Sequence, residues 1–97
     1  MTLTNEQKKF LRGLAHDLNT IIWVGQKNVT ENVLKEIENA LQYHELIKIK
    51  IRVGSREERQ AATQVICDET GAQMIQRTGN VIVLYRKNTD APVINLP

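Results

Sequence analysis

The chain of 97 residues has one cysteine, two histidines and only 4% aromatic residues, so it is poor in the side chains that build disulfides, metal sites and base-stacking surfaces. Its single cysteine, Cys67, cannot form an internal disulfide, and no cluster has metal-ligand spacing. No apolar stretch reaches membrane-spanning length, and the first residues lack the apolar core of a signal peptide. We therefore expect no metal and no membrane contact, and the default location is a reducing cytoplasm.

Groups for catalysis are equally scarce. His16 and His44 each fall at the end of a predicted helix, where the helix dipole favours them, and no nucleophile or paired base lies nearby in sequence. Cys67 is typical of a small buried hydrophobe, and the acids of residues 31–45 are typical of a solvated helix face. We expect a protein that is not an enzyme and needs no cofactor.

The charge is unevenly placed. Residues 30–45 hold four acids against one base, a balance of −3, which leaves +5 on the rest because the net charge is +2. Such asymmetry permits a basic face that suits a polyanionic partner, although scattered solvated charge is the alternative. The acids are Glu31, Glu36, Glu38 and Glu45.

Hydrophobic periodicity and capping boxes at Thr4–Gln7 and Ser55–Glu58 predict seven elements in the order αβαβαββ. Helices are expected over 5–15, 30–44 and 56–70, and strands over 21–24, 47–53, 72–77 and 81–85. The fold class is α/β of the α+β two-layer kind, with one sheet and helices packed against it. We assign residues 1–87 to this domain and 88–97 to a loosely held polar tail.

Two segments are candidates for phosphate contact. Residues 24–30 leave a strand and enter a helix, so backbone N–H groups are free to point at an anion, with Gly25 allowing close approach and Lys27 supplying charge. A plain connecting turn is the alternative. On the predicted strand 47–53, the alternating basic side chains form a row with about 6–7 Å between neighbours, close to phosphate spacing. They are Lys48, Lys50 and Arg52.

The basic row on this strand is equally consistent with a purely structural role, because lysines keep exposed sheet faces soluble and protect edge strands from aggregation. Lys8, Lys9 and Arg12 would extend a basic field, as would Arg56 and Arg59, if the fold brings them together. The terminal strands lack the adjacent aromatic residues of base-stacking sheets. We expect Trp23 to be buried in its strand, with stacking on a base as the alternative.

Several blocks along the chain together resemble the bacterial YhbY proteins, single-domain members of the CRM RNA-binding family. The match runs from about residue 3 to 86. The blocks are Gln7-Lys8, Leu11-Arg12-Gly13-Leu14-Ala15-His16, Val24-Gly25, Thr30-Glu31, His44-Glu45-Leu46-Ile47-Lys48-Ile49-Lys50, Glu69-Thr70-Gly71-Ala72 and Leu84-Tyr85-Arg86.

The resemblance implies a four-stranded mixed sheet and a fold similar to the C-terminal domain of translation initiation factor three. It also implies binding to ribosomal RNA of large-subunit precursors during ribosome assembly, by a monomer, with ribosomal proteins as further candidate partners. The family's GxxG loop falls on Gly25, Gln26, Lys27 and Asn28. Asn28 replaces the second loop glycine, Asn32 another family glycine, and Thr20 a proline common before the first strand.

The leading hypothesis is therefore an RNA-binding ribosome-assembly factor that uses the loop and a basic surface. Its site residues are Gly25, Gln26, Lys27, Asn28, Lys8, Lys9, Arg12, Lys48, Lys50 and Arg52. The main alternative is a protein-interaction module that docks a basic ribosomal or assembly protein through its acidic second helix. A small hydrolase or nuclease is disfavoured for want of catalytic groups.

Overall fold

The structure, a computed structural model, describes residues 2–97, and its elements follow the predicted order αβαβαββ. Each lies close to its predicted range, and the α+β class is confirmed. The helices are α1 (Asn5–His16), α2 (Glu31–His44) and α3 (Arg56–Thr70), and the strands are β1 (Ile22–Val24), β2 (Leu46–Ile51), β3 (Gln73–Thr78) and β4 (Val81–Tyr85).

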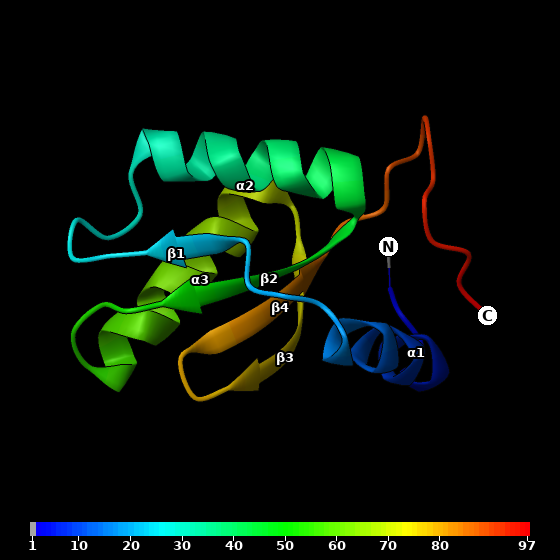
Figure 1. The fold of residues 1–97 in the computed structure, drawn as a ribbon, viewed down its shortest axis with the longest axis horizontal. Coiled ribbons are helices and arrows are strands. Elements are labelled where there is room, and N and C mark those ends of the chain that lie inside the picture. The colour runs from blue at the N-terminus through cyan, green and yellow to red at the C-terminus, as the bar shows by residue number, and fades with distance from the viewer. Residues whose placement is uncertain (1) are drawn as a thin grey trace.

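The four strands form one mixed sheet in the order β1-β2-β4-β3 (Figure 1). β1 and β2 are parallel and are connected through α2, whereas β4 runs antiparallel to both β2 and β3. β2 and β4 are thus interior strands, as the continuous apolar run of β4 indicates, and β1 and β3 are the edges.

The ends of the helices follow the predicted capping chemistry. The hydroxyl oxygens of Thr4 and Ser55 accept hydrogen bonds from the backbone N–H groups of Gln7 and Glu58, at 3.1 and 3.2 Å. The side chains of Gln7 and Glu58 accept in return from the cap residues, so both capping boxes are complete. Gly71 ends α3 with φ of 74°, a left-handed conformation that glycine adopts without steric cost.

The main core lies between the sheet and the pair α2 and α3, which cover one face together (Figure 1). The alternation predicted for 47–53 directs three isoleucines of β2 into it. Its largest members are Ile22, Val24, Ile37, Leu41, Ile47, Ile49, Ile51, Val53, Ile66, Ile82 and Leu84.

A second, smaller core fixes α1 against the opposite face of the sheet. It consists of Leu3, Leu11, Ala15, Leu46, Ile75, Val83 and Tyr85. Because α1 covers only one end of this face, the rest is uncovered, and we call that part the open face (Figure 1). The side chains that reach it include Trp23, Lys48, Lys50, Gln76, Thr78 and Val81.

Some apolar side chains of the helices lie outside the buried stripes and are exposed. Val65 is 44% exposed because the buried stripe of α3 follows Ala62 and Ile66, and Val65 lies on its flank. Leu14 is 40% exposed for the same reason, since Leu11 and Ala15 are the side chains of α1 that reach the sheet.

The C-terminal segment is held firmly, contrary to the expectation of a loosely held tail. The carboxylate of Glu45 is fully buried and accepts three backbone hydrogen bonds, from Asn88 at 2.7 Å, Val93 at 2.7 Å and Ile94 at 2.6 Å. Ile94 and Leu96 then pack on the smaller core. Glu45 is therefore no part of a solvated acidic face.

Burial alone raises the pKa of Glu45, but the N–H groups of Asn88, Ile94 and Val93 outweigh it. With the nearby charge of Lys87, they hold the pKa of this carboxyl below its ordinary value. The ionised form is thus part of the folded structure. Glu45 also has a positive φ of 64°, a conformation that non-glycine residues rarely adopt and that the three hydrogen bonds stabilise.

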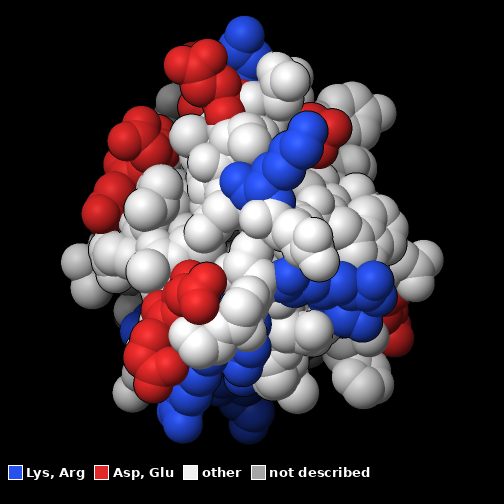
Figure 2. Space-filling view, turned by 90° about the vertical axis from the view of Figure 1, so that its left-hand side faces the viewer, with Lys and Arg blue, Asp and Glu red and all other residues white. Residues whose placement is uncertain are grey.

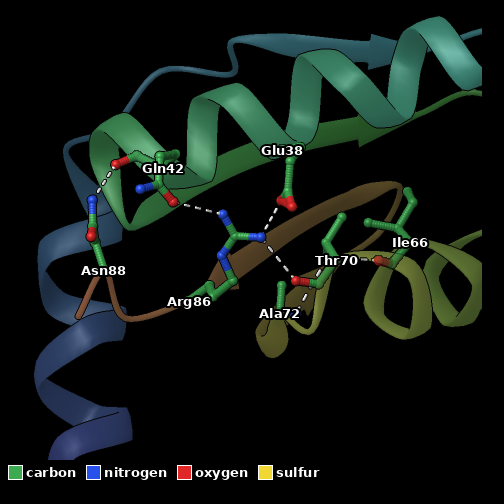
Figure 3. Close-up of polar contacts among 7 residues, drawn as sticks. All are labelled: Glu38, Gln42, Ile66, Thr70, Ala72, Arg86 and Asn88. Carbon is green, nitrogen blue, oxygen red and sulfur yellow. Dashed lines mark hydrogen bonds and ion pairs between the residues drawn. The ribbon is translucent and has the colours of Figure 1, made fainter. Parts of the chain in front are cut away.

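Arg86 joins α2 to the end of α3 (Figure 3). Its Nη1 donates to the backbone oxygen of Thr70 at 2.9 Å and pairs with the carboxylate of Glu38, while Nη2 donates to Oε1 of Gln42 at 3.2 Å. The side chain of Asn88 donates to the backbone oxygen of Gln42 at 2.8 Å. Arg86 is thereby engaged within the fold and is not available to a ligand.

Candidate functional site

A groove of about 770 Å³ runs between α1 and the open face of the sheet. Three basic side chains and one histidine line it, and none of its lining residues is acidic. We call it the basic groove. Its lining residues are Lys9, Arg12, Gly13, Ala15, His16, Thr20, Lys48, Gln76, Thr78, Val81 and Val83.

The helical repeat explains which side of α1 faces the groove. Lys9, Arg12, Gly13 and His16 recur at spacings of three and four residues, so they share one side of the helix. That side borders the stripe of Leu11 and Ala15, which anchors α1 to the sheet. Burial of the stripe therefore fixes the basic side chains at the margin of the open face.

Lys48 and Lys50 enter the site from β2. Their neighbours Ile47, Ile49 and Ile51 are buried in the main core, so strand alternation directs both lysines to the open face. β2 lies between β1 and β4, which excludes protection of an edge strand as the reason for these lysines.

Trp23 is 54% exposed, which corrects the expectation that it is buried. Its neighbours Ile22 and Val24 point into the main core, so its indole lies on the other face of the sheet. Trp23 is paired in register with Lys50, and an aromatic side chain therefore stands beside the basic row on the open face.

The loop of Gly25, Gln26, Lys27 and Asn28, here the Gly25 loop, follows β1 directly and is exposed. It closes through a hydrogen bond of 2.9 Å from the N–H of Asn28 to the backbone oxygen of Gly25. Asn28 has φ of 63°, so asparagine keeps the bend that a glycine would otherwise make. Within residues 2–97, the N–H groups of Gln26 and Lys27 have no acceptor.

The fold does not require glycine at position 25. Its φ lies outside the left-handed region, and a Cβ at this position would meet no atom within 4 Å. The free space therefore lies on the outer side of the loop. Thr30 ends the connection by capping α2, with its hydroxyl oxygen accepting from the N–H of Val33 at 3.2 Å.

The Gly25 loop and the basic row meet at one end of the sheet. The N–H of Arg52, the residue after β2, donates to the backbone oxygen of Val24 at 2.8 Å, so Arg52 lies beside the start of the loop. Figure 2 views this end of the molecule, where Lys and Arg side chains lie in separate groups near the centre, at the right and at the bottom, and acidic side chains lie mostly at the top left, left and lower left.

The predicted site residues therefore divide by position. Lys9, Arg12 and Lys48 line one groove, with Lys50 next along the strand. Arg52 and the Gly25 loop continue the line at the far end. Lys8 is half-buried and does not line the groove, so it is the predicted residue that stands apart.

Comparison with known proteins identifies the family. Residues 3–86 match the CRS1 / YhbY (CRM) domain. The chain belongs to the CRM domain family. It is 47% identical over 92 residues to an RNA-binding protein of Haemophilus influenzae, covering 95% of this chain and 93% of that protein.

Two further relatives agree with this placement in the CRM family. The Bacillus subtilis protein named "Probable RNA-binding protein YqeI" is 37% identical, over 98% of this chain and 99% of its own. The solution structure of the Staphylococcus aureus protein SAV1595 superposes with a TM-score of 0.82 at 31% identity, covering 99% of this chain and all of that one. The fold seen here is thus shared with a solved structure over the whole chain.

A second basic cluster in this CRM domain is separate from the groove. Arg56 and Arg59 of α3 line a pocket of about 260 Å³ with Arg77 of β3 and Gly79. Arg77 is paired with Ile82, a main-core residue, so its side chain belongs to the side of the sheet that α3 covers. Arg56 and Arg59 therefore do not extend the basic groove.

Sequence reasoning missed Gly13 of the basic groove and Arg77 of the second basic cluster. Gly13 lies inside α1, where glycine is unfavourable, and its position in the groove wall leaves space that a Cβ would fill. A glycine within a predicted helix was the signal that could have found it. Arg77 gives no such signal, because it is one of three consecutive polar residues at the end of an edge strand.

Two further findings concern metal binding and membrane spanning. Among the described side chains, no group of three or more His, Cys, Asp or Glu residues is placed to hold a metal ion. Within 2–97, none of the helices combines the length and the hydropathy that spanning a lipid bilayer requires.

Proposed function

We propose that this protein binds RNA through the basic groove and the Gly25 loop, and that its target is ribosomal RNA in precursors of the large ribosomal subunit. It acts in the cytoplasm as a monomer, by binding alone and not as an enzyme. Support comes from the CRM match over residues 3–86 and from relatives named for RNA binding.

The observation that carries the proposal is the composition of the groove. Lys9, Arg12 and Lys48 come from two elements far apart in the sequence and line one groove without an acidic neighbour. Within the described chain, the ion pair found is Arg86 with Glu38, so these three cations are not neutralised by carboxylates. The phosphates of a polyanion would supply the negative charge that these cations lack, and binding would release the counterions held by those phosphates.

The spacing of the donors suits a ribose-phosphate chain. Lys48 and Lys50 are two residues apart on a strand, a separation of about 6–7 Å that is close to the spacing of successive phosphates. At the end of the row, the unpartnered N–H groups of Gln26 and Lys27 add neutral donors for phosphate oxygens. Such contacts fix the position of a strand without reading its sequence.

The experiment that tests this proposal compares two charge-neutralising variants in binding to structured ribosomal RNA. Replacing both Lys48 and Lys50 by Ala should weaken binding clearly, with little change in thermal stability, because both side chains point away from the main core. The variant K35A, on the exposed side of α2, is the matched control and should bind normally. Equal affinity of all three proteins would contradict the proposal.

A sucrose-gradient profile of cell extracts tests the finer claim. The protein should sediment with precursors of the large subunit, and the variant with both Lys48 and Lys50 replaced should shift toward the free fraction. Sedimentation with mature small subunits, or no sedimentation with particles at all, would contradict the assignment to large-subunit precursors.

The competing function is docking of a basic protein on α2. Its support is the exposed pair Glu31 and Glu36, since Glu45 is buried and Glu38 pairs with Arg86. Reversing the charge of Glu31 and Glu36 separates the two functions. Lost particle association with intact RNA affinity would favour protein docking, whereas unchanged association would favour RNA.

A further inference from the structure

Trp23 is an exposed aromatic residue beside the basic row on the open face. It lies on β1, an edge strand, so one side of its indole faces no further strand. On the other side, its register partner is Lys50 of β2, and two residues later the chain enters the Gly25 loop. The ring thus lies beside a strand that carries a cation, two residues before a loop with free amides.

The fold itself makes no use of this ring. Neither core includes Trp23, whereas its neighbours Ile22 and Val24 are buried in the main core. Within residues 2–97, the indole N–H has no acceptor. Ile21, which precedes β1, is also 42% exposed, so the apolar surface beside the basic row extends past the ring.

This arrangement offers one contact for each part of a nucleotide, the indole for the base and the lysine for the phosphate. Adjacent strands lie about 4.8 Å apart, so a base stacked on the indole of Trp23 would bring its phosphate within reach of Lys50 on the next strand. Stacking on an aromatic ring tolerates every base because each has a π-face, while the lysine contacts the backbone. A paired base cannot use the ring, because its faces are covered within the duplex.

We propose that Trp23 is a stacking platform for an unpaired nucleobase, and that the open face therefore takes single-stranded RNA segments in preference to duplex. The inference rests on the proposed RNA-binding function and names its substrate class. Lys50 holds the phosphate of the stacked nucleotide, and the basic groove holds the strand beyond it.

The chain contains one tryptophan, so tryptophan emission, excited selectively over the two tyrosines, reports on Trp23 alone. We would titrate the wild-type protein with a short single-stranded oligoadenylate, with an abasic ribose-phosphate strand of equal length, and with an RNA duplex. The oligoadenylate should quench the tryptophan emission to saturation. The abasic strand and the duplex should bind through their phosphates with little quenching.

Variants separate the stacking claim from RNA binding as such. W23L should lower the affinity for oligoadenylate about tenfold, the loss expected for one base–aromatic contact, and leave the affinity for the abasic strand unchanged. W23F keeps a ring and should restore much of the affinity. Y43L removes a ring that is 76% exposed on α2, and this matched control should bind like the wild type.

Each outcome decides the proposal. W23L binding to oligoadenylate with wild-type affinity, or equal quenching by the abasic strand, would overturn stacking while leaving phosphate binding by Lys48 and Lys50 intact. Unchanged RNA affinity combined with lost particle association in W23L would assign the ring to a protein contact and would also overturn it. No binding of any RNA by the wild type would refute the proposed function itself.

Discussion

Arg12 on α1 and Lys48 on β2 line the same groove, although all of β1 and α2 separates them in the sequence. Their meeting depends on two burial patterns. Leu11 and Ala15 seat α1 on the sheet, and the alternation of β2 directs Lys48 out of the main core. The site is therefore a product of packing, and its properties can be tested through residues that leave the packing intact.

The salt dependence of RNA binding measures how many phosphates the groove neutralises. Removing both cations with R12A and K48A should reduce the slope of log affinity against log salt by about 0.7 per lost phosphate contact on single-stranded RNA. Filter binding or anisotropy over a salt series measures this slope. Wild-type slope in the double variant would mean that neither side chain reaches a phosphate.

Gly13 provides a variant in which stability and function should move in opposite directions. Within a helix, alanine is more favourable than glycine, so G13A should raise the free energy of unfolding by about 0.5–1 kcal/mol. The added Cβ has no neighbour within 4 Å and would occupy the wall of the basic groove, so RNA affinity should fall. Denaturant unfolding and RNA titration of the same sample measure both quantities.

A result in which G13A binds RNA as well as the wild type would show that bound RNA does not approach this wall. The matched control is A61G, an exposed position of α3 outside the groove. It should lower stability by roughly 1 kcal/mol and leave RNA affinity unchanged.

Asn28 determines the bend of the Gly25 loop through its positive φ. N28G should keep the bend, change the free energy of unfolding by no more than about 1 kcal/mol, and preserve or improve RNA affinity because glycine allows closer approach. N28V places a β-branched residue at positive φ and should lower both the free energy of unfolding and the RNA affinity. Thermal unfolding and RNA binding of the pair would measure this, and normal affinity in N28V would contradict a role for the bend.

Glu45 should make the stability of the fold depend on acid. Because its pKa is lowered in the folded state, the carboxylate stabilises the fold above the ordinary glutamate value of 4.5, and that stability is lost as pH falls through the folded pKa. E45Q turns an NH₂ group toward N–H donors and should cost about 1–3 kcal/mol at neutral pH. It should also flatten the acid limb of the stability curve.

Denaturant unfolding between neutral and acidic pH measures the effect of E45Q. E36Q, at an exposed position of α2, is the control and should keep the wild-type acid limb. An acid limb in E45Q as steep as that of the wild type would show that another group governs the loss of stability.

Local patterns predicted most of the fold. Capping boxes at Thr4 and Ser55, the left-handed Gly71 and the alternation of β2 determine where elements begin, end and face, and each depends on residues close in sequence. The mixed, four-stranded character of the sheet required the family resemblance, because local periodicity does not determine which strands pair.

Two misassigned residues show where sequence reasoning failed. Trp23 lies in an unbroken apolar run, which is typical of a strand covered on both faces, but α1 packs mainly on β2 and β3 and the smaller core contains no residue of β1. The local sequence places Glu45 on a solvated helix face, because its partners Asn88, Val93 and Ile94 come from the far end of the chain. Both errors concern contacts that only the folded chain defines.

The most direct test of RNA binding by this face is a map of backbone amide chemical shifts during titration with single-stranded RNA. The account predicts one continuous band of shifted amides through the exposed side of α1 at Arg12, through β2 at Lys48 and Lys50, and into the Gly25 loop. Shifts confined to the outer side of α2, around Glu31 and Glu36, would contradict it.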